Sequence, residues 1–358
     1  MLQENRPTVS VIIKALNEER HIAAAIESAL AGLCEIDGEV ILADGGSQDR
    51  TIEIAHRYPI TIVQLTRTED RSCGAGVQLG FQYSRGRYLL LMDGDMRLHG
   101  GFLPAAISFL EENPAVAGVG GHVIECKVVN VEYEQRQRRH DPDRVIGPVT
   151  RLGGSGLYRR SAIDSIGYVT DRNLHGAEEL DLGARLHARG WSLARIDCGA
   201  VDHHGHTGNA YWLLFRRMRN RNACATGELF RAALGRSHFS FVVGKDYAGL
   251  LSLIVTGWWL TLLLLPFVLS GWTAALAASG VFLLPFAAMS LRWRSIRLGL
   301  YSITAWNVFT SCSWLGLLRP RRPPADWIES TVIKEGSHRP EAPGRFSVSA
   351  APKSCHLS

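Results

Sequence analysis

The sequence lacks the cysteine spacing of a zinc site or of a disulfide framework. Its 358 residues include seven cysteines, and none of them forms a CxxC pair. An odd and scattered set of cysteines argues against a small disulfide-stapled protein and favours a reducing compartment. The N-terminus, Met1 to Ser10, is polar and shows no apolar core of a signal peptide, so we expect the N-terminal region to stay in the cytoplasm.

Charged side chains are missing altogether between Tyr247 and Leu291. A run of this length can hold two membrane-spanning helices of about 20 residues each. Ser270-Gly271 near its middle predicts the turn of a hairpin. Lys245 precedes the run and Arg292 follows it, and positive charge at both ends favours a hairpin whose ends face the cytoplasm. A buried pair of helices in a soluble protein is the alternative.

The next uncharged stretch, Leu298 to Leu318, is richer in serine, threonine and asparagine. If this stretch spans the membrane, the arginines that follow it lie outside the cell, against the positive-inside rule. If it is an interfacial helix, these arginines stay on the cytoplasmic side. We therefore predict a catalytic domain in residues 1–240, a membrane region in residues 247–318 with two or three helices, and a polar, disordered tail in residues 319–358. The expected location is the inner (plasma) membrane, multi-pass, with the catalytic domain in the cytoplasm.

The overall composition excludes a disordered chain, because 46% of the residues are hydrophobic and 20% are charged. The net charge of +5 is concentrated in short stretches such as Arg216 to Arg221. This distribution suits a membrane surface or a phosphate ligand rather than nucleic acid, and we expect no nucleic-acid partner. The arginine stretch could grip a diphosphate of donor or acceptor, or it could bind anionic membrane lipids.

The first 125 residues alternate short apolar runs with helical patterns, which predicts an α/β fold with a parallel sheet covered by helices. Asn17 is expected to cap the first helix. Ligands of such sheets bind beyond the carboxyl ends of the strands. The predicted strands cover residues 9–13, 40–43, 60–65 and 88–92.

Polar motifs follow two of these strands. Asp44-Gly45-Gly46-Ser47 follows the second, and free amides at the next helix start could receive an anion. Asp93-Gly94-Asp95 follows the fourth, and its two carboxylates can hold Mg²⁺ or Mn²⁺ while a diphosphate supplies further ligands. A lone D-G-D is more often an ordinary turn, but its place after a buried strand favours the metal.

Four segments in this order resemble the family 2 glycosyltransferases with the GT-A fold, a Rossmann-like mixed sheet flanked by helices. They are V-S-V-I-I-K-A-L-N-E-E, A-D-G-G-S-Q-D-R-T, D-G-D and the G-A-E-E-L-D-L segment that begins at Gly176. The resemblance runs from about Thr8 to Arg221. It implies an inverting transfer from a UDP- or GDP-linked sugar with a divalent metal ion.

The resemblance also implies roles for single residues on the donor side. Asp95 would bind the metal directly, with Asp93 near the ribose and the metal. A late histidine often completes the metal shell in this fold, and His204 is the choice among His203, His204 and His206. The remaining donor-site residues would be Leu16 and Glu18 in the nucleotide pocket, Asp44 at the base or ribose, and Arg71 facing the nucleotide. The family's usual D-D-G-S is D-G-G-S here.

On the acceptor side, Glu179 occupies the place of the family's catalytic base, which is usually Asp. Glu178 is the alternative if the register is shifted by one residue. Gly153 and Gly154 resemble the segment that forms the floor of the acceptor site, with a plain surface loop as the alternative.

The function expected from these features is transfer of a sugar to a lipid-linked or saccharide acceptor, in the biosynthesis of cell-surface polysaccharide or glycolipid. A processive synthase is disfavoured because no Q-x-x-R-W motif is present and the helices are too few for a channel. A non-catalytic membrane scaffold and a nucleotide-binding regulator on the same fold remain as alternatives.

Overall fold

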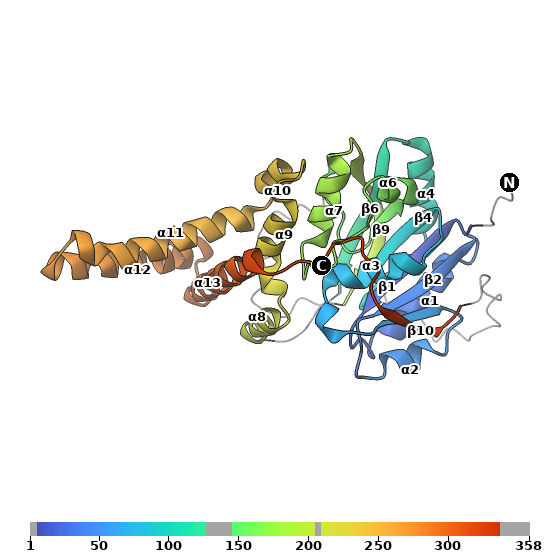
Figure 1. Cartoon of the computed structure of the whole chain (residues 1–358), viewed down its shortest axis with the longest axis horizontal. Coiled ribbons are helices and arrows are strands. Elements are labelled where there is room, and N and C mark those ends of the chain that lie inside the picture. Colours follow the sequence, from blue (N-terminus) through green and yellow to red (C-terminus); the bar gives the residue numbers. More distant parts are fainter. Residues whose placement is uncertain (1–5, 127–144, 205–208, 337–358) are drawn as a thin grey trace.

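The computed structural model describes residues 6–126, 145–204 and 209–336. One mixed sheet organises this part of the chain, with the strand order β10-β3-β2-β1-β4-β8-β6-β9-β5, and β7 pairs with β9 beside it (Figure 1). The mixed sheet with flanking helices agrees with the predicted fold class.

The N-terminal half of the sheet is parallel, as the apolar runs predict. β1 pairs in parallel with β2 and β4, and β2 pairs in parallel with β3. The strands are β1 (Val9–Ala15), β2 (Gly38–Asp44), β3 (Thr61–Leu65) and β4 (Tyr88–Asp93). They alternate with α1 (Ile22–Gly32), α2 (Thr51–Ala55), the short 3₁₀ helix η1 (Thr68–Asp70) and α3 (Cys73–Tyr83).

The following strands make the sheet mixed, because β8 pairs antiparallel with both β4 and β6. These strands are β5 (Met96–Leu98), β6 (Val116–Glu125), β7 (Gly147–Val149), β8 (Leu157–Arg159) and β9 (Ser192–His203). The helices among them are α4 (Phe102–Glu112), α6 (Arg160–Asp164) and α7 (Glu178–His187).

Helices cover both faces of the sheet, and the side chains of β1 alternate between them. Val11 and Ile13 pack in a cluster with Ile26 of α1 and Phe102 of α4. Ile12 packs on the other face, in a cluster with side chains of α3, α6 and α7. This alternation follows from the two-residue period of a strand, and burial on both faces explains why β1 is apolar almost throughout.

The start of the first helix differs from the prediction. α1 begins at Ile22, and Asn17 lies in a loop before it with a φ of 57°. Asn17 tolerates this left-handed conformation, and its Oδ1 accepts a hydrogen bond from the Gln48 amide at 2.8 Å. Asn17 therefore ties two loops together instead of capping the helix, and the loop brings Glu18 to the end of the sheet.

Two long helices project from the rest of the molecule as a hairpin (Figure 1). α11 (Tyr247–Val268) and α12 (Gly271–Trp293) are each long and apolar enough to cross a membrane, and in their most apolar windows only 11% and 6% of the residues are buried. Trp258 Nε1 donates to the Val281 carbonyl at 2.8 Å and joins the two helices. Such exposure of apolar side chains does not fit the alternative of a buried helical pair.

The helix after the hairpin has a different character. α13 (Ile296–Leu318) is not among the helices that are apolar enough to cross a membrane in the described part of the chain. It packs on both helices of the hairpin and also on the helices that precede the hairpin. Tyr301 and Ala305 of α13 cluster with Ala210 and Leu214. The helices before the hairpin are α8 (Ala210–Arg219), the 3₁₀ helix η3 (Asn222–Cys224), α9 (Ala225–Ala233) and α10 (Phe239–Lys245).

The prediction of a disordered tail from residue 319 is wrong for residues up to 336. The chain returns to the sheet, where β10 (Ser330–Lys334) pairs antiparallel with β3. Ile328 is fully buried in a cluster with side chains of β2, β3 and α3. A short apolar segment flanked by proline-rich sequence carries too weak a compositional signal for a sequence-based prediction. The rest of the predicted tail, residues 337–358, lies outside the described residues.

Candidate active site

A cavity of about 590 Å³ opens beyond the carboxyl ends of β1 and β4. The two strands are neighbours in register, with Lys14 opposite Asp93, so the loops that follow them meet. Leu16 and Glu18 line the cavity from the first loop, and Asp93 and Asp95 line it from the second. These four predicted donor residues therefore lie at one site.

The D-G-D turn is held tightly against the first loop. The Gly94 amide donates to the Lys14 carbonyl at 2.9 Å. A Cβ at Gly94 would lie 3.0 Å from Ala15 Cβ and 3.1 Å from Glu18 Cγ. A side chain at this position would push the loops apart, so the central glycine sets the spacing of the two aspartates.

The carboxylates of this cavity fit a divalent cation. Burial and the nearby Asp95 and Asp93 carboxylates raise the pKa of Glu18 to about 7. Burial likewise raises the pKa of Asp93, with Asp95 adding to the effect. A cation among these oxygens would relieve their repulsion. The described residues contain no preformed group of three His, Cys, Asp or Glu ligands, so a bound diphosphate would have to complete the coordination shell.

The imidazole of His203 forms an ion pair with Asp95. Its Nε2 lies 3.4 Å from Asp95 Oδ2, and its Nδ1 lies 2.9 Å from Glu125 Oε2. Burial lowers its pKa, but bonds to these two carboxylates raise the pKa of His203 to about 10. The His204 ring stacks on His21 with centroids 5.5 Å apart, while its amide donates to the Asp95 carbonyl. His204 as a metal ligand stays a prediction, and His206 lies outside the described residues.

Asp44 is fully buried, and its carboxylate shapes the loop that follows β2. It accepts hydrogen bonds from the amides of Gly46 and Ser47, both at 2.8 Å, and from Gln64 Nε2 at 2.9 Å. Gly45 lines the cavity, whereas Asp44 does not. A direct contact of Asp44 with the base or ribose stays a prediction, because its oxygens are engaged within the protein.

Arg71 braces the same loop from the side of the cavity. Its Nε donates to the Gly45 carbonyl at 2.7 Å, and its second guanidinium nitrogen donates to the Gly46 carbonyl at 2.9 Å. Arg71 lines the cavity, so its charge faces the predicted nucleotide pocket.

The two adjacent glutamates at the start of α7 have different environments. Glu178 Oε1 forms an ion pair with Lys14 Nζ at 2.7 Å, and the same ammonium group lies 3.2 Å from Asp93 Oδ1. Glu179 forms no ion pair in the described part of the chain. Burial is the main cause that raises the pKa of Glu179 to about 8, and the negative charge of the adjacent Glu178 is the second. Glu178 is thus committed to a structural pair, and Glu179 has the properties of a proton acceptor.

The glycine segment of the predicted acceptor floor touches the D-G-D turn. A Cβ at Gly154 would lie 3.4 Å from Asp93 Oδ2 and 2.9 Å from the methyl carbon of Met96. The Gly153 carbonyl accepts from the Ser155 amide at 2.6 Å. A side chain at position 154 would therefore press on Met96 and touch the Asp93 carboxylate, and the glycine avoids this.

Two features of the site escape the sequence-based prediction. The first is Lys14, for which the available signal is that a lysine near the end of a buried strand needs a partner. The second is the position of the arginine stretch, which the sequence leaves open. The structure places it in the wall of the active-site cavity, which includes Arg216, Arg217, Arg219 and Arg221.

Comparison with known proteins agrees with this geometry. The model of the family described as "Glycosyl transferase family 2" matches residues 10–167. Dodecaprenyl-phosphate galacturonate synthase from Rhizobium johnstonii is 31% identical over 111 residues, which cover 29% of this chain and 32% of that protein. Putative glycosyltransferase EpsE from Bacillus subtilis is 28% identical over 197 residues, which cover 52% of this chain and 68% of that protein.

The chain matches about a third of the length of the Rhizobium protein and of the dolichol-phosphate mannosyltransferase from Pyrococcus furiosus. Among solved structures, mannosyltransferase PcManGT from Pyrobaculum calidifontis, in complex with GDP-Man and Mn²⁺, superposes with a TM-score of 0.55. The superposition covers 88% of each chain at 18% identity, which establishes a shared fold.

Proposed function

We propose that the chain, whose residues 10–167 match the family model described as "Glycosyl transferase family 2", is an inverting, membrane-associated glycosyltransferase that uses a UDP- or GDP-linked sugar. The acceptor is a lipid-linked or saccharide molecule of cell-surface polysaccharide or glycolipid biosynthesis. One observation carries the proposal, namely that three groups meet at a single cavity. Asp93 and Asp95 line it together with the arginines of α8. Lys14 also lines it and forms ion pairs with Asp93 and with Glu178 of α7.

The donor diphosphate would lie between the D-G-D turn and the arginines of α8. Asp95, with Asp93, would hold Mg²⁺ or Mn²⁺, which supplies positive charge for the departing nucleoside diphosphate. Arg216 and Arg217 offer planar guanidinium groups that suit the same diphosphate. The Pyrobaculum relative, whose structure contains GDP-Man and Mn²⁺, supports both a nucleotide-sugar donor and a divalent ion.

Glu179 is the catalytic base of the proposed reaction. The acceptor hydroxyl loses its proton to the Glu179 carboxylate while its oxygen forms a bond to the anomeric carbon. The bond from that carbon to the diphosphate breaks, and the nucleoside diphosphate leaves with the electron pair. A positioned base of this kind contributes roughly 10²–10⁴-fold to the rate.

The path of the chain supports a hairpin with two crossings. Strand β10 pairs with β3 of the catalytic domain, so the segments before residue 247 and after residue 318 belong to the same folded unit. A chain that leaves and re-enters one compartment crosses the membrane an even number of times. α11 and α12 supply two crossings, and α13 then lies at the membrane surface or against the protein.

A donor screen tests the proposal. The full-length protein in lipid nanodiscs is incubated with Mn²⁺ and a panel of radiolabelled UDP- and GDP-sugars, and hydrolysis or transfer is measured. We expect one donor to be consumed, and EDTA to suppress the reaction. Nucleotide binding without turnover of any donor would instead favour the regulator, and absence of binding would favour the scaffold.

A further inference from the structure

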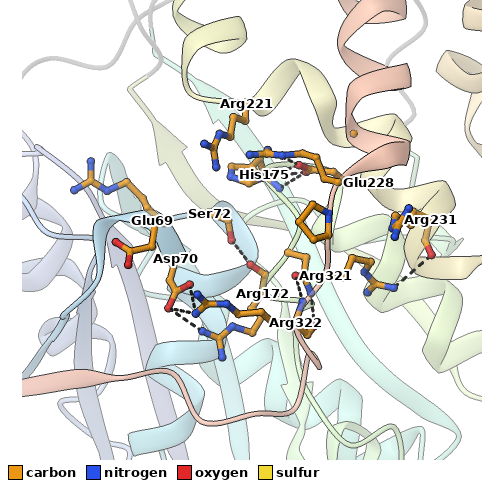
Figure 2. A pocket seen from close by; sticks show the side chains of 15 residues that line it. Glu69, Asp70, Ser72, Arg172, His175, Arg221, Glu228, Arg231, Arg321 and Arg322 are labelled. Atoms are coloured by element: carbon orange, nitrogen blue, oxygen red, sulfur yellow. Dashed lines mark hydrogen bonds and ion pairs between the residues drawn. The ribbon is translucent and has the colours of Figure 1, made fainter.

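A second cavity adjoins the active site and is separate from its D-G-D turn. Its volume is about 230 Å³, several times the roughly 30 Å³ that one water molecule occupies, so a phosphate group fits inside. It shares part of its wall, including Arg71, Ser72 and Arg221, with the active-site cavity. The remaining wall comes largely from α9, from the end of α13 and from the arginine-rich segment after it (Figure 2).

Arginines dominate this wall. Seven arginines line the second cavity, against three carboxylates. Asp70 is already paired, with Arg172 at 3.2 Å and with Arg322. Glu228 is paired with Arg319 at 3.3 Å. Arg321 is paired with the buried Asp171, which lies outside the cavity wall. These carboxylates hold the segment after α13 in place. With Asp171 counted, four carboxylates still face seven arginines, so positive charge remains in excess around the cavity.

Several of these arginines have no carboxylate partner in the part of the chain that the structure describes. Arg71 donates only to backbone carbonyls. Arg231 donates to the Leu317 carbonyl at 2.6 Å. Arg221 lies in the wall of both cavities with a φ of 68°, a conformation that is unfavourable for a residue with a side chain. Uncompensated guanidinium groups around a cavity are the groups that recognise phosphate oxygens.

The cavity also lies where a membrane lipid can reach it. Gly316, near the end of α13, lines it, and α13 packs against both helices of the apolar hairpin. A lipid whose chain lies beside the hairpin would place its head group near the end of α13. A free phosphate compound would gain nothing from this location, so the position favours a lipid-borne phosphate.

We propose that the second cavity binds the phosphate or diphosphate linker of a lipid-linked saccharide acceptor. The linker would lie among Arg221, Arg231 and the arginines after α13, and the saccharide would extend past Arg221 toward Glu179. A hydroxyl of that saccharide, rather than the phosphate itself, is then the group that needs a base. The inference rests on the proposed function, because it assigns the acceptor class of the same reaction.

Binding of farnesyl diphosphate to the full-length protein in detergent tests the site. Saturating UDP, GDP and Mn²⁺ keep the donor cavity occupied during the measurement. We expect Arg231→Gln and Arg319→Gln to weaken binding about tenfold or more, as for loss of a charge-assisted hydrogen bond. Arg231→Lys, which keeps the charge, should retain most of the affinity. Arg189→Gln, at an exposed position just after α7, is the control and should bind like the wild type.

Other ligands identify the chemistry that the site recognises. Farnesol, which lacks the diphosphate, should bind far more weakly than farnesyl diphosphate. Inorganic pyrophosphate that binds as tightly as farnesyl diphosphate would overturn the lipid assignment, because the site would then be one for a free anion. Equal affinity for farnesyl diphosphate in all four variants would overturn the site itself.

Nucleotide binding, measured on the same samples, separates this inference from the proposed function. The arginine variants should bind UDP or GDP as well as the wild type, which also shows that they are folded. If the wild type and Arg231→Gln transfer sugar equally well to a lipid-linked saccharide, the proposed function stands and the inference fails. If no nucleotide binds but farnesyl diphosphate still depends on Arg231, the proposed function fails and the acceptor assignment fails with it.

Discussion

Lys14 Nζ lies 2.7 Å from Glu178 Oε1, across 164 positions of sequence, and this contact joins the first strand of the sheet to the start of α7. Burial lowers the pKa of Lys14, but the Asp93 and Glu178 carboxylates raise it well above the usual value. The lysine therefore stays charged and holds two buried carboxylates, one beside the predicted metal site and one beside the predicted base.

Lys14→Met should destabilise the catalytic domain, because it leaves the Glu178 and Asp93 carboxylates without their shared partner. Breaking a buried ion pair from one side costs about 3–5 kcal/mol. The double variant Lys14→Met with Glu178→Met should recover a large part of the loss. Thermal unfolding in detergent, followed by tryptophan fluorescence, measures both changes. A Lys14→Met protein as stable as the wild type would mean that the pair is not formed in solution.

Glu179→Gln should separate binding from chemistry. The amide has nearly the shape of the carboxylate but cannot take up the proton, so turnover should fall by roughly 10²–10⁴-fold. Donor affinity should change only a few-fold, as measured by nucleotide titration. Glu178→Gln is the matched comparison and should mainly lower the stability of the protein, because it removes the ion pair with Lys14. If Glu178→Gln instead loses turnover while Glu179→Gln keeps it, the base is Glu178.

Asp95→Asn should abolish transfer and make nucleotide binding nearly independent of Mn²⁺. The substitution removes a charged oxygen ligand from the turn that would hold the ion. Titration of UDP or GDP with and without Mn²⁺ measures the effect directly, without relying on turnover. Near-normal activity of Asp95→Asn would show that the metal is held elsewhere, or that none is used.

Much of the fold could be predicted because its signals are local. The four parallel strands are short apolar runs, and burial on both faces of the sheet makes such runs easy to recognise. The D-G-D turn could be located because it directly follows the last of them. Contacts between distant segments could not be predicted in this way. The role of Lys14 depends on its ion pair with Glu178, and β10 is a strand only because it pairs with β3. In both cases the partner is far away in the sequence.

The choice among the histidines depends on a contact of the same kind. His203 is the last residue of β9, which pairs with β5, and His204 follows it. The structure shows an ion pair between the His203 ring and Asp95, whereas His204 as a metal ligand stays a prediction. A one-residue choice of this kind needs the register of the sheet, which composition and spacing do not provide.

The return of the chain to the sheet predicts an effect on the stability of the protein. Ile328→Ala should destabilise the protein by about 2–5 kcal/mol, because it opens a hole in a fully buried apolar cluster. Val332→Ala in β10 is the matched control, since Val332 is 41% exposed and should change stability little. Thermal unfolding of the two variants provides the comparison. Equal stability of Ile328→Ala and the wild type would mean that the segment does not dock on the sheet in solution.

The hairpin of α11 and α12 predicts which positions face the outside of the cell. Ser270 lies at the turn between the two helices, whereas Lys245 and Ser295 lie at its two ends. A membrane-impermeant maleimide added to intact cells should therefore label Ser270→Cys and miss Lys245→Cys and Ser295→Cys. All three should be labelled after the membrane is permeabilised, which shows that the sites are accessible. The wild type measures the background from the seven native cysteines and should give no signal from outside. Labelling of Ser295→Cys in intact cells would mean that the chain crosses only once before α13, and β10 could then not lie in the same compartment as β3 without a further crossing.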